Sequence, residues 1–241
     1  MTDAVAAPTA TPSRPIPWTL FVGLAIAATI AGQVPFDRIF AAATFGVPVL
    51  RSAAILALGL IGAAVGGRIG LHVEPRDRKG ALLVPLAAAT VIGVWCAVID
   101  TAMRGQFIPG YLDLVTTTPL ATRIPAFMMR AFNENILYRL FLTSVLAWGL
   151  GRFWKAPDGR PASGAFWTAI VMAQAINIGA NVTVRFGVTP LGLVYDVLRY
   201  MIPGVTWGWL YWKRDFQGNE IASTTVHIVL QPLVTLSLSL V

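Results

Sequence analysis

Long apolar runs, separated by short polar stretches, fill almost the whole chain after residue 16. A transmembrane helix needs about 20 predominantly apolar residues. Runs of this length predict seven helices, at 18–34, 46–67, 82–99, 122–151, 163–184, 188–212 and 219–241. The predicted fold class is therefore all-α, a polytopic transmembrane helical bundle. Residues 1–16 lack apolar periodicity and are expected to form a disordered tail, so that 17–241 form a single transmembrane domain.

The segment 101–121 interrupts the apolar pattern with charged residues, prolines and three consecutive threonines. It is expected to be a loop containing a short interfacial helix. If the fourth long helix begins near Ile124, Glu134 lies about ten residues further on, roughly 15 Å along the helix axis. That depth is close to the middle of a bilayer.

The composition fits a membrane protein. Hydrophobic residues make up 56% of the chain and charged residues 12%, which is too little polar surface to cover a water-soluble globule of this length. The formal net charge is +7, but the basic residues are scattered through short loops and form no patch interleaved with aromatic residues. This distribution excludes nucleic acid as a partner and matches the bias of basic residues toward cytoplasmic loops.

The predicted loops allow an orientation to be assigned. If the seven spans hold, ten basic residues share one side of the membrane: Arg14, Arg68, Arg76, Arg78, Lys79, Arg152, Lys155, Arg160, Lys213 and Arg214. Five lie on the other side: Arg38, Arg104, Arg123, Arg130 and Arg185. We therefore expect the N-terminus inside and the C-terminus outside. The alternative, a cleaved signal peptide over 1–31, has only Arg14 as its basic region.

Ionisable residues within the predicted spans are candidates for function, because each costs roughly 2.5–3.5 kcal/mol to insert. Glu134 is the main candidate, since Asp196 and Arg199 are three residues apart and are expected to neutralise each other. Arg139 lies four residues after Asn135, on the same helical face, and is expected to bond to it. Glu134 is therefore the main candidate for a functional carboxylate at membrane depth.

Two other spans carry polar stripes at helical spacing. The stripes consist of Gln174, Asn177 and Asn181 on the fifth span and Ser223, Thr224, His227 and Gln231 on the seventh. Such amides often only join helices, and this structural interpretation is favoured for Gln174 and Asn181. Glu134 and His227 are less suited to that role, because an unmatched buried carboxylate is costly.

Three short patterns resemble those of the CAAX prenyl protease and bacteriocin-processing (CPBP, or Abi) family of intramembrane proteases. The family patterns are Glu-Glu-x-x-x-Arg, Phe-x-x-x-His and His-x-x-x-Asn or Asp. In this chain they read Glu134-Asn135-x-x-x-Arg139, Ala173-x-x-x-Asn177 and His227-x-x-x-Gln231. Their order and their places on the fourth, fifth and seventh spans are similar to the family, over about residues 85–241.

The resemblance implies a CPBP-like helical core in a bacterial cytoplasmic membrane, which cleaves a peptide bond near the membrane end of a protein or peptide substrate. Glu134 would be the general base that activates water. His227 and Gln231 would stabilise the oxyanion, with Asn177 as a further donor. Arg139 would hold its helix through Asn135. The expected partners are the bilayer and a membrane-protein or peptide substrate.

This chain departs from the family at several motif positions. Asn135 replaces the second glutamate, so Arg139 is left with a neutral partner or with Asp196 as counter-ion. Asn177 replaces the second-motif histidine. A catalytic zinc site needs about three protein ligands, and only Glu134 and His227 qualify, so neither zinc nor another cofactor is expected. No motif supports His227 as an axial ligand of a tetrapyrrole.

The substituted motifs leave a second function open. The chain could be a catalytically silent CPBP-like subunit that binds or shields a partner membrane protein or complex. A small transporter is a third possibility, but it would be expected to show related halves with interrupted helices, and the sequence shows no internal repeat.

Overall fold

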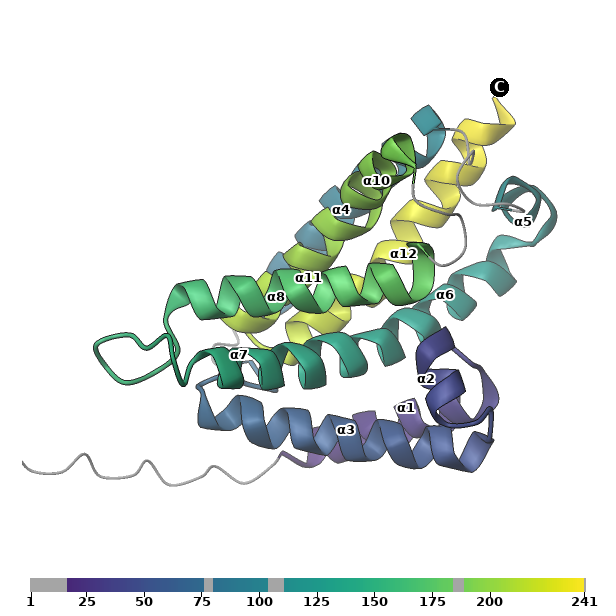
Figure 1. The fold of residues 1–241 in the computed structure, drawn as a ribbon. Helices are drawn as coiled ribbons and strands as arrows, with labels where there is room; N and C mark the ends of the chain where they lie inside the picture. The colour runs from purple at the N-terminus through teal and green to yellow at the C-terminus, as the bar shows by residue number, and fades with distance from the viewer. Residues whose placement is uncertain (1–16, 76–79, 104–110, 184–188, 241) are drawn as a thin grey trace, which may run out of the picture.

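The computed structural model describes residues 17–75, 80–103, 111–183 and 189–240. The predicted disordered tail, 1–16, lies outside the described residues, as do Arg14, Arg76, Arg78, Lys79, Arg104 and Arg185. Within the described part of the chain every regular element is helical, apart from one isolated β-bridge between Lys155 and Pro161. The predicted all-α class is therefore confirmed (Figure 1).

Each of the seven predicted apolar ranges is helical in the structure, and the ends differ by only a few residues. The elements are α1 (Trp18–Gln33), α3 (Pro48–Arg68), α4 (Leu83–Met103), α6 (Leu120–Asn135), η1 (Ile136–Thr143), α7 (Ser144–Leu150), α8 (Ser163–Ile178), η2 (Gly179–Thr183), α10 (Pro190–Asp196), η3 (Val197–Met201), α11 (Ile202–Lys213) and α12 (Phe216–Ser239). Two short helices, α2 (Arg38–Ala43) and α5 (Tyr111–Thr117), lie in the connections. The predicted short helix within 101–121 is thus present.

Three helices of the described residues are long and apolar enough to cross a membrane, namely α3, α4 and α12. The fourth, fifth and sixth predicted ranges are continuous in helix but pass through a π-helical turn, η1, η2 or η3. A π turn inserts one extra residue into the α-helical register and is frequent at functional sites. The π turns η1 and η3 each separate two shorter α-helices, and η2 follows α8 at the end of the described part of the fifth range.

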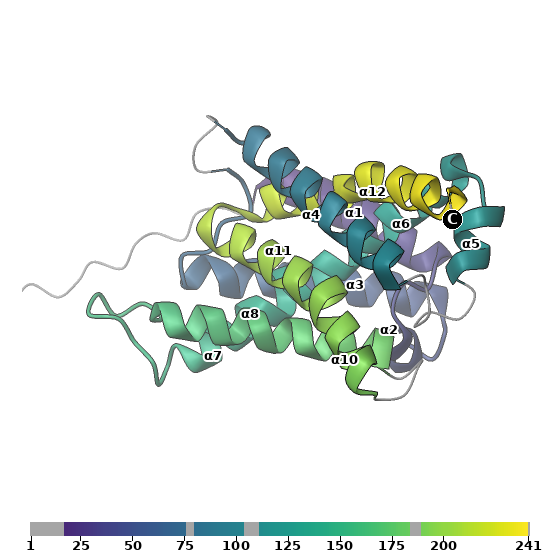
Figure 2. The same ribbon diagram turned by 90° about the horizontal axis from the view of Figure 1, so that it is seen from above.

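The helices form two groups, each with its own apolar core. One group is built from α1, α3, η1, α7 and α8, and its core includes Leu24, Ile55, Leu140 and Ala169. The other consists of α4, α11 and α12, with a core that includes Ile92, Leu210 and Leu230. Figure 1 shows α3, α7 and α8 alongside each other and α4, α11 and α12 running obliquely to them. In Figure 2, α4 and α11 run in the same oblique direction, and α11 passes in front of α3 and α8.

Glycines allow close approach within the first group. A Cβ atom added to Gly62 of α3 would lie 2.4 Å from the backbone oxygen of Leu140 and 2.6 Å from the Cα atom of Phe141. These atoms belong to the backbone of η1, which cannot move aside as a flexible side chain can. Small residues at helix contacts are typical of membrane bundles. Gly62 therefore sets the spacing between α3 and η1.

Several connections lie at one end of the bundle. The Gln217 backbone N–H donates to the carbonyl of Val73 at 3.0 Å, and its side-chain Nε2 donates to Thr19 Oγ1 at 3.3 Å. The Arg160 guanidinium lies beside Gly70. The start of α1 and the connections after α3, α7 and α11 therefore meet at the same end.

Candidate functional site

A cavity of about 360 Å³ lies where the two helix groups meet. Its wall combines apolar residues of α4, α6, α11 and α12 with a polar side. The polar side chains are Arg130, Glu134, Asn135, Arg139, Gln174, Asn177, Asn181, Arg199, Ser223, His227 and Gln231. All six residues predicted from the motifs are among them. Residues from α6, η1, α8 and α12, which are far apart in the sequence, thus surround one volume.

The three π turns all border this cavity. Arg139 belongs to η1, Asn181 to η2, and Arg199 and Tyr200 to η3. A π turn rotates the residues that follow it relative to an unbroken α-helix, so it changes which side chains face the interior. Helical wheels drawn at 3.6 residues per turn do not include this rotation.

Glu134 lies in the cavity wall but is not free. Its Oε1 atom accepts a hydrogen bond from Arg130 Nε at 2.6 Å, one helical turn earlier on α6. No described residue donates a hydrogen bond to Oε2. Because α6 begins at Leu120 rather than near Ile124, Glu134 is about 21 Å along the helix instead of the expected 15 Å. The carboxylate therefore has one oxygen fixed by an arginine and one oxygen available.

The predicted bond between Arg139 and Asn135 is wrong. Arg139 Nη2 donates to Gln174 Oε1 on α8, while Asn135 Nδ2 donates to Ser223 Oγ on α12. Gln174 can approach because its side chain lies against Gly204, where a Cβ atom would be only 2.0 Å from the amide carbon. The π turn that begins after Asn135 shifts Arg139 out of its expected i, i+4 relation.

The predicted ion pair between Asp196 and Arg199 is also wrong. Arg199 Nε pairs with Asp100 Oδ1 on α4 at 2.7 Å, and Tyr195 donates to the same oxygen at 2.8 Å. Among the described residues Asp196 forms no ion pair, and it is not the counter-ion of Arg139. The predicted third span ends at 99, whereas α4 continues to Met103, so Asp100 lies inside the helix rather than beyond it.

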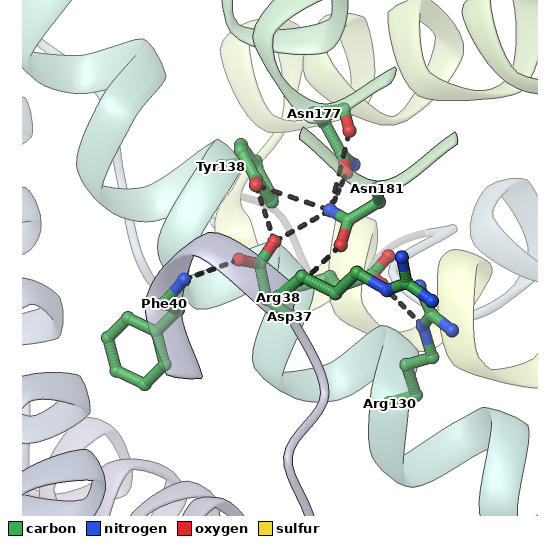
Figure 3. Close-up of polar contacts among 8 residues, drawn as sticks. Asp37, Arg38, Phe40, Arg130, Tyr138, Asn177 and Asn181 are labelled. Carbon is green, nitrogen blue, oxygen red and sulfur yellow. Dashed lines mark hydrogen bonds and ion pairs between the residues drawn. The ribbon is translucent and has the colours of Figure 1, made fainter. Parts of the chain in front are cut away.

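The predicted amide stripe on α8 and η2 lines the cavity and also joins segments, as the structural interpretation expected. Gln174 Nε2 donates to the Tyr200 carbonyl at 3.0 Å. Asn181 Nδ2 lies 2.6 Å from Asp37 Oδ2 and 2.9 Å from Asn177 Oδ1 (Figure 3). Asn181 is therefore tied both to Asn177 and to the connection between α1 and α2.

The stripe on α12 is present with one exception. Ser223, His227 and Gln231 line the cavity, whereas the Thr224 hydroxyl donates to the carbonyl of Glu220 on its own helix at 2.6 Å. The His227 ring stacks on Phe127 of α6, with ring centres 5.4 Å apart. His227 Nδ1 and Gln231 Oε1 are buried and have no hydrogen-bond partner among the described residues. These atoms can bond to water or to a ligand in the cavity.

Glu220 is a carboxylate that the sequence interpretation missed. Both of its oxygens are buried, and no described residue bonds to them with standard geometry. The carboxylate lies next to the Asn135 amide and within range of the Arg139 charge. Glu134 is therefore not the only candidate carboxylate inside the bundle. The signal was present in the sequence, because Glu220 precedes His227 by seven residues on the same helical face.

Asp37 was missed as well, and no pattern in the sequence could connect it to the cavity. It precedes α2 and caps it, since Asp37 Oδ1 accepts the Phe40 backbone N–H at 2.7 Å. Such a cap is recognisable from sequence, but its bond to Asn181 joins residues 144 positions apart. Only the packing of η2 against the start of α2 brings them together.

Within the described residues no group of three or more His, Cys, Asp or Glu side chains lies close enough together to hold a metal ion. Comparison of the chain with family models, with curated proteins and with solved structures found no match. The motif resemblance to CPBP proteases therefore stands on the residues quoted above.

The cavity offers a defined set of chemical groups. It presents a carboxylate with one available oxygen, an imidazole, and side-chain amides at Asn177 and Gln231. A cavity of this volume has room for water molecules, and its unpartnered polar atoms are groups that water can bond to. A carboxylate base, water and amide donors are the components needed for hydrolysis of an acyl group.

Proposed function

We propose that this protein is an intramembrane endopeptidase of the CPBP type. One observation carries this proposal: six residues predicted separately from three motifs line the same cavity. Residues that three separate motifs place on different helices thus face one volume, as an active site requires. The cavity volume is in the range of ligand-binding clefts and suits a short peptide segment.

In the proposed reaction, Glu134 removes a proton from a water molecule as the water oxygen attacks the substrate carbonyl carbon. The carbonyl oxygen becomes an oxyanion, which the amides of Asn177 and Gln231 and the imidazole of His227 stabilise. The tetrahedral intermediate then loses the amine, and Glu134 returns the proton to the leaving nitrogen. Arg130 keeps Glu134 oriented through one oxygen and leaves the other for water.

The proposal includes a multi-pass arrangement in a bacterial cytoplasmic membrane. Three helices of the described chain meet the length and hydropathy of a membrane span. The other four predicted spans are α1, which has 16 residues, and the three helical stretches that contain π turns. If the chain crosses the membrane seven times, the start of α1 and the connections after α3, α7 and α11 must lie on the same side. The structure has these four segments at the same end of the bundle. We place that end in the cytoplasm, because it carries the larger share of the basic residues.

A catalytically silent subunit is the second candidate, favoured by a specific contact. The Arg130–Glu134 ion pair at 2.6 Å neutralises the carboxylate, and both Asn135 and Asn177 replace ionisable residues of the family motifs. In this second reading the polar cavity is inherited architecture, and the protein binds or shields a partner membrane protein.

Substitution of Glu134 distinguishes the two functions. In the endopeptidase, Glu134→Gln preserves the shape of the side chain but removes the base, so peptide cleavage falls by about 100-fold or more. Cleavage is measured without a known substrate, by quantitative mass spectrometry of new N-termini in membranes from cells that express each variant. His227→Ala is expected to lower the same signals by roughly 100- to 1000-fold through loss of an oxyanion donor.

Glu74→Gln is the matched control, because it makes the same chemical change in an exposed loop. It should leave the new N-termini at wild-type levels. If wild type and Glu134→Gln give the same new N-termini while both proteins are equally abundant, the endopeptidase proposal is wrong. Retention of a co-purifying membrane partner by both Glu134→Gln and His227→Ala would then support the silent subunit.

A further inference from the structure

Asp37 is a buried carboxylate outside the cavity, with three hydrogen-bond donors around it. Its side chain is only 3% exposed. Oδ1 accepts the Phe40 N–H at 2.7 Å, and Oδ2 accepts the Tyr138 hydroxyl and Asn181 Nδ2, both at 2.6 Å. Figure 3 shows these side chains converging from the α1–α2 connection, from η1 and from η2. Oδ1 thus caps α2, and Oδ2 bonds to Tyr138 and Asn181.

The contact with Asp37 fixes the direction of the Asn181 amide. Asp37 Oδ2 is the acceptor in this contact, so the nitrogen end of Asn181 faces it. An amide nitrogen carries two hydrogens. The two shortest contacts of Asn181 Nδ2 are with Asp37 Oδ2, at 2.6 Å, and with Asn177 Oδ1, at 2.9 Å. The Arg38 backbone N–H, 3.5 Å from Asn181 Oδ1, fits the same orientation.

The direction of Asn177 follows from that of Asn181. Because Asn181 donates to Asn177 Oδ1, the oxygen end of the Asn177 amide is occupied from the side of Asp37. No described residue accepts a hydrogen bond from Asn177 Nδ2, and Asn177 lines the cavity. The amide therefore presents its NH2 group as a donor to whatever the cavity holds.

We propose that Asp37 is a positioning residue, which orients Asn181 and through it Asn177 so that the cavity receives a hydrogen-bond donor. The ligand group that this donor fits is an acceptor oxygen, such as a peptide carbonyl or the oxyanion formed from it. As a role in peptide cleavage, this positioning rests on the proposed function. The orientation of the amides themselves does not depend on any reaction.

Asp37→Asn reverses the chain of amides while preserving the shape of the side chain. Asparagine can still cap α2 through its oxygen. Its NH2 group then faces Asn181, which must turn its oxygen toward position 37. Because the same end of the Asn181 amide faces both position 37 and Asn177, the turned Asn181 oxygen also faces Asn177. Asn177 then turns its NH2 group toward Asn181 and its oxygen toward the cavity. A donor at the cavity wall is thereby replaced by an acceptor.

Nuclear magnetic resonance of asparagine-¹⁵N-labelled protein in detergent micelles measures this reversal directly. In wild type the Asn181 side-chain amide is protected from hydrogen exchange and the Asn177 amide exchanges with cavity water. In Asp37→Asn the Asn177 side-chain amide becomes protected, by about tenfold for one added hydrogen bond. Asp113→Asn, the same change at an exposed position of α5, leaves both amides unchanged. Unaltered exchange at both Asn177 and Asn181 in Asp37→Asn overturns the positioning role.

The double variant Asp37→Asn, Asn181→Asp separates positioning from simple structural support. Position 37 then donates to a carboxylate at 181, so a polar pair is kept and the thermal stability is expected to return toward wild type. Asn177 still turns its NH2 group toward position 181 and away from the cavity. The new N-termini are therefore expected to be absent from the double variant, as from Asp37→Asn. Recovery of cleavage together with stability overturns the proposal. If wild type itself yields no new N-termini, the peptidase fails, while the exchange measurement still decides the orientation.

Discussion

Each arginine in the cavity wall bonds to an acidic or amide side chain, and for Arg139 and Arg199 that partner lies on another helix. Arg130 bonds to Glu134 on the next turn, Arg139 to Gln174 of α8, and Arg199 to Asp100 of α4. The Arg199–Asp100 pair is well shielded, with the two side chains 14% and 0% exposed. Removing one partner of such a pair strands a buried charge, at a cost of about 3–5 kcal/mol. These pairs therefore stabilise the arrangement of helices around the cavity.

The bond between Asn135 and Ser223 gives a prediction at this scale. Asn135→Leu and Ser223→Ala each remove the contact between α6 and α12, so their effects should not add. A double-mutant cycle on the free energy of unfolding in mixed micelles should give a coupling of about 0.5–1.5 kcal/mol. Asn135→Leu combined with Gln174→Leu is the control, because Gln174 bonds to Arg139 and not to Asn135. Coupling in the control pair and none with Ser223 would contradict the observed partners.

At the residue scale, sequence spacing predicted which side chains share a face but not what lies opposite them. Glu134, Asn177, His227 and Gln231 were predicted to face the interior, and all four line the cavity. Their partners depend on the register between helices, which spacing along one helix does not contain. Arg139 was paired with Asn135 by that spacing, and the π turn of η1 makes the pairing wrong.

At the scale of elements, glycines and π turns decide how closely the helices pack. Gly62 lies against the backbone of η1, and Gly204 against the side chain of Gln174. In both contacts a larger residue would push apart elements that carry cavity residues. The position of Arg139 in η1 and its bond to Gln174 thus depend on small residues of α3 and α11.

Gly62→Ala should destabilise the protein by about 1–3 kcal/mol, because the new methyl group overlaps the backbone of Leu140 and Phe141. Gly67→Ala on the same helix is the matched control, since no atom lies within 4 Å of a Cβ placed there. The control should be neutral, or more stable by up to about 1 kcal/mol from helix propensity. The midpoint of thermal unfolding in detergent measures both. Equal midpoints for the two variants would show that α3 and η1 are not in close contact.

The helix ranges were predictable because a long apolar run has few alternatives to a helix. The seven ranges match the helical stretches closely, including the long one that begins at Leu120. The π turns were not predictable. A π turn changes the hydrogen-bond register of a helix but not its composition, so the mean hydropathy of the segment is the same with or without it. The caps of α2 and α12 are recognisable from sequence, because an aspartate, Asp37 or Asp215, precedes each helix and accepts a backbone N–H.

At the scale of the whole molecule, the cavity lies between the two helix groups, where helices of each group turn polar side chains toward the other group. In the first group, η1 and α8 pack in the apolar core and carry the cavity residues Arg139, Gln174 and Asn177. The second core binds α12, which supplies His227 and Gln231. The cavity is therefore lined by residues from elements of both cores.

One end of the bundle has the features of a membrane interface. The Arg152 guanidinium lies 3.8 Å from the centre of the Trp148 ring, and Lys213 Nζ lies 3.6 Å from that of Trp212. Tryptophans with neighbouring basic residues are typical of the headgroup region, and an excess of basic residues is typical of the cytoplasmic side. This end contains the connections after α7 and α11.

Cysteine labelling tests the proposed seven crossings and their orientation. Three predicted spans separate Phe45 from Lys155, so these exposed positions should lie on opposite sides of the membrane. In a Cys96→Ala background, which removes the buried native cysteine, Phe45→Cys should react with a membrane-impermeant maleimide on intact cells. Lys155→Cys should react only after permeabilisation if the basic end faces the cytoplasm, as we propose. Reaction of both from the same side would mean that the number of crossings is wrong, and the reversed pattern would mean that the orientation is.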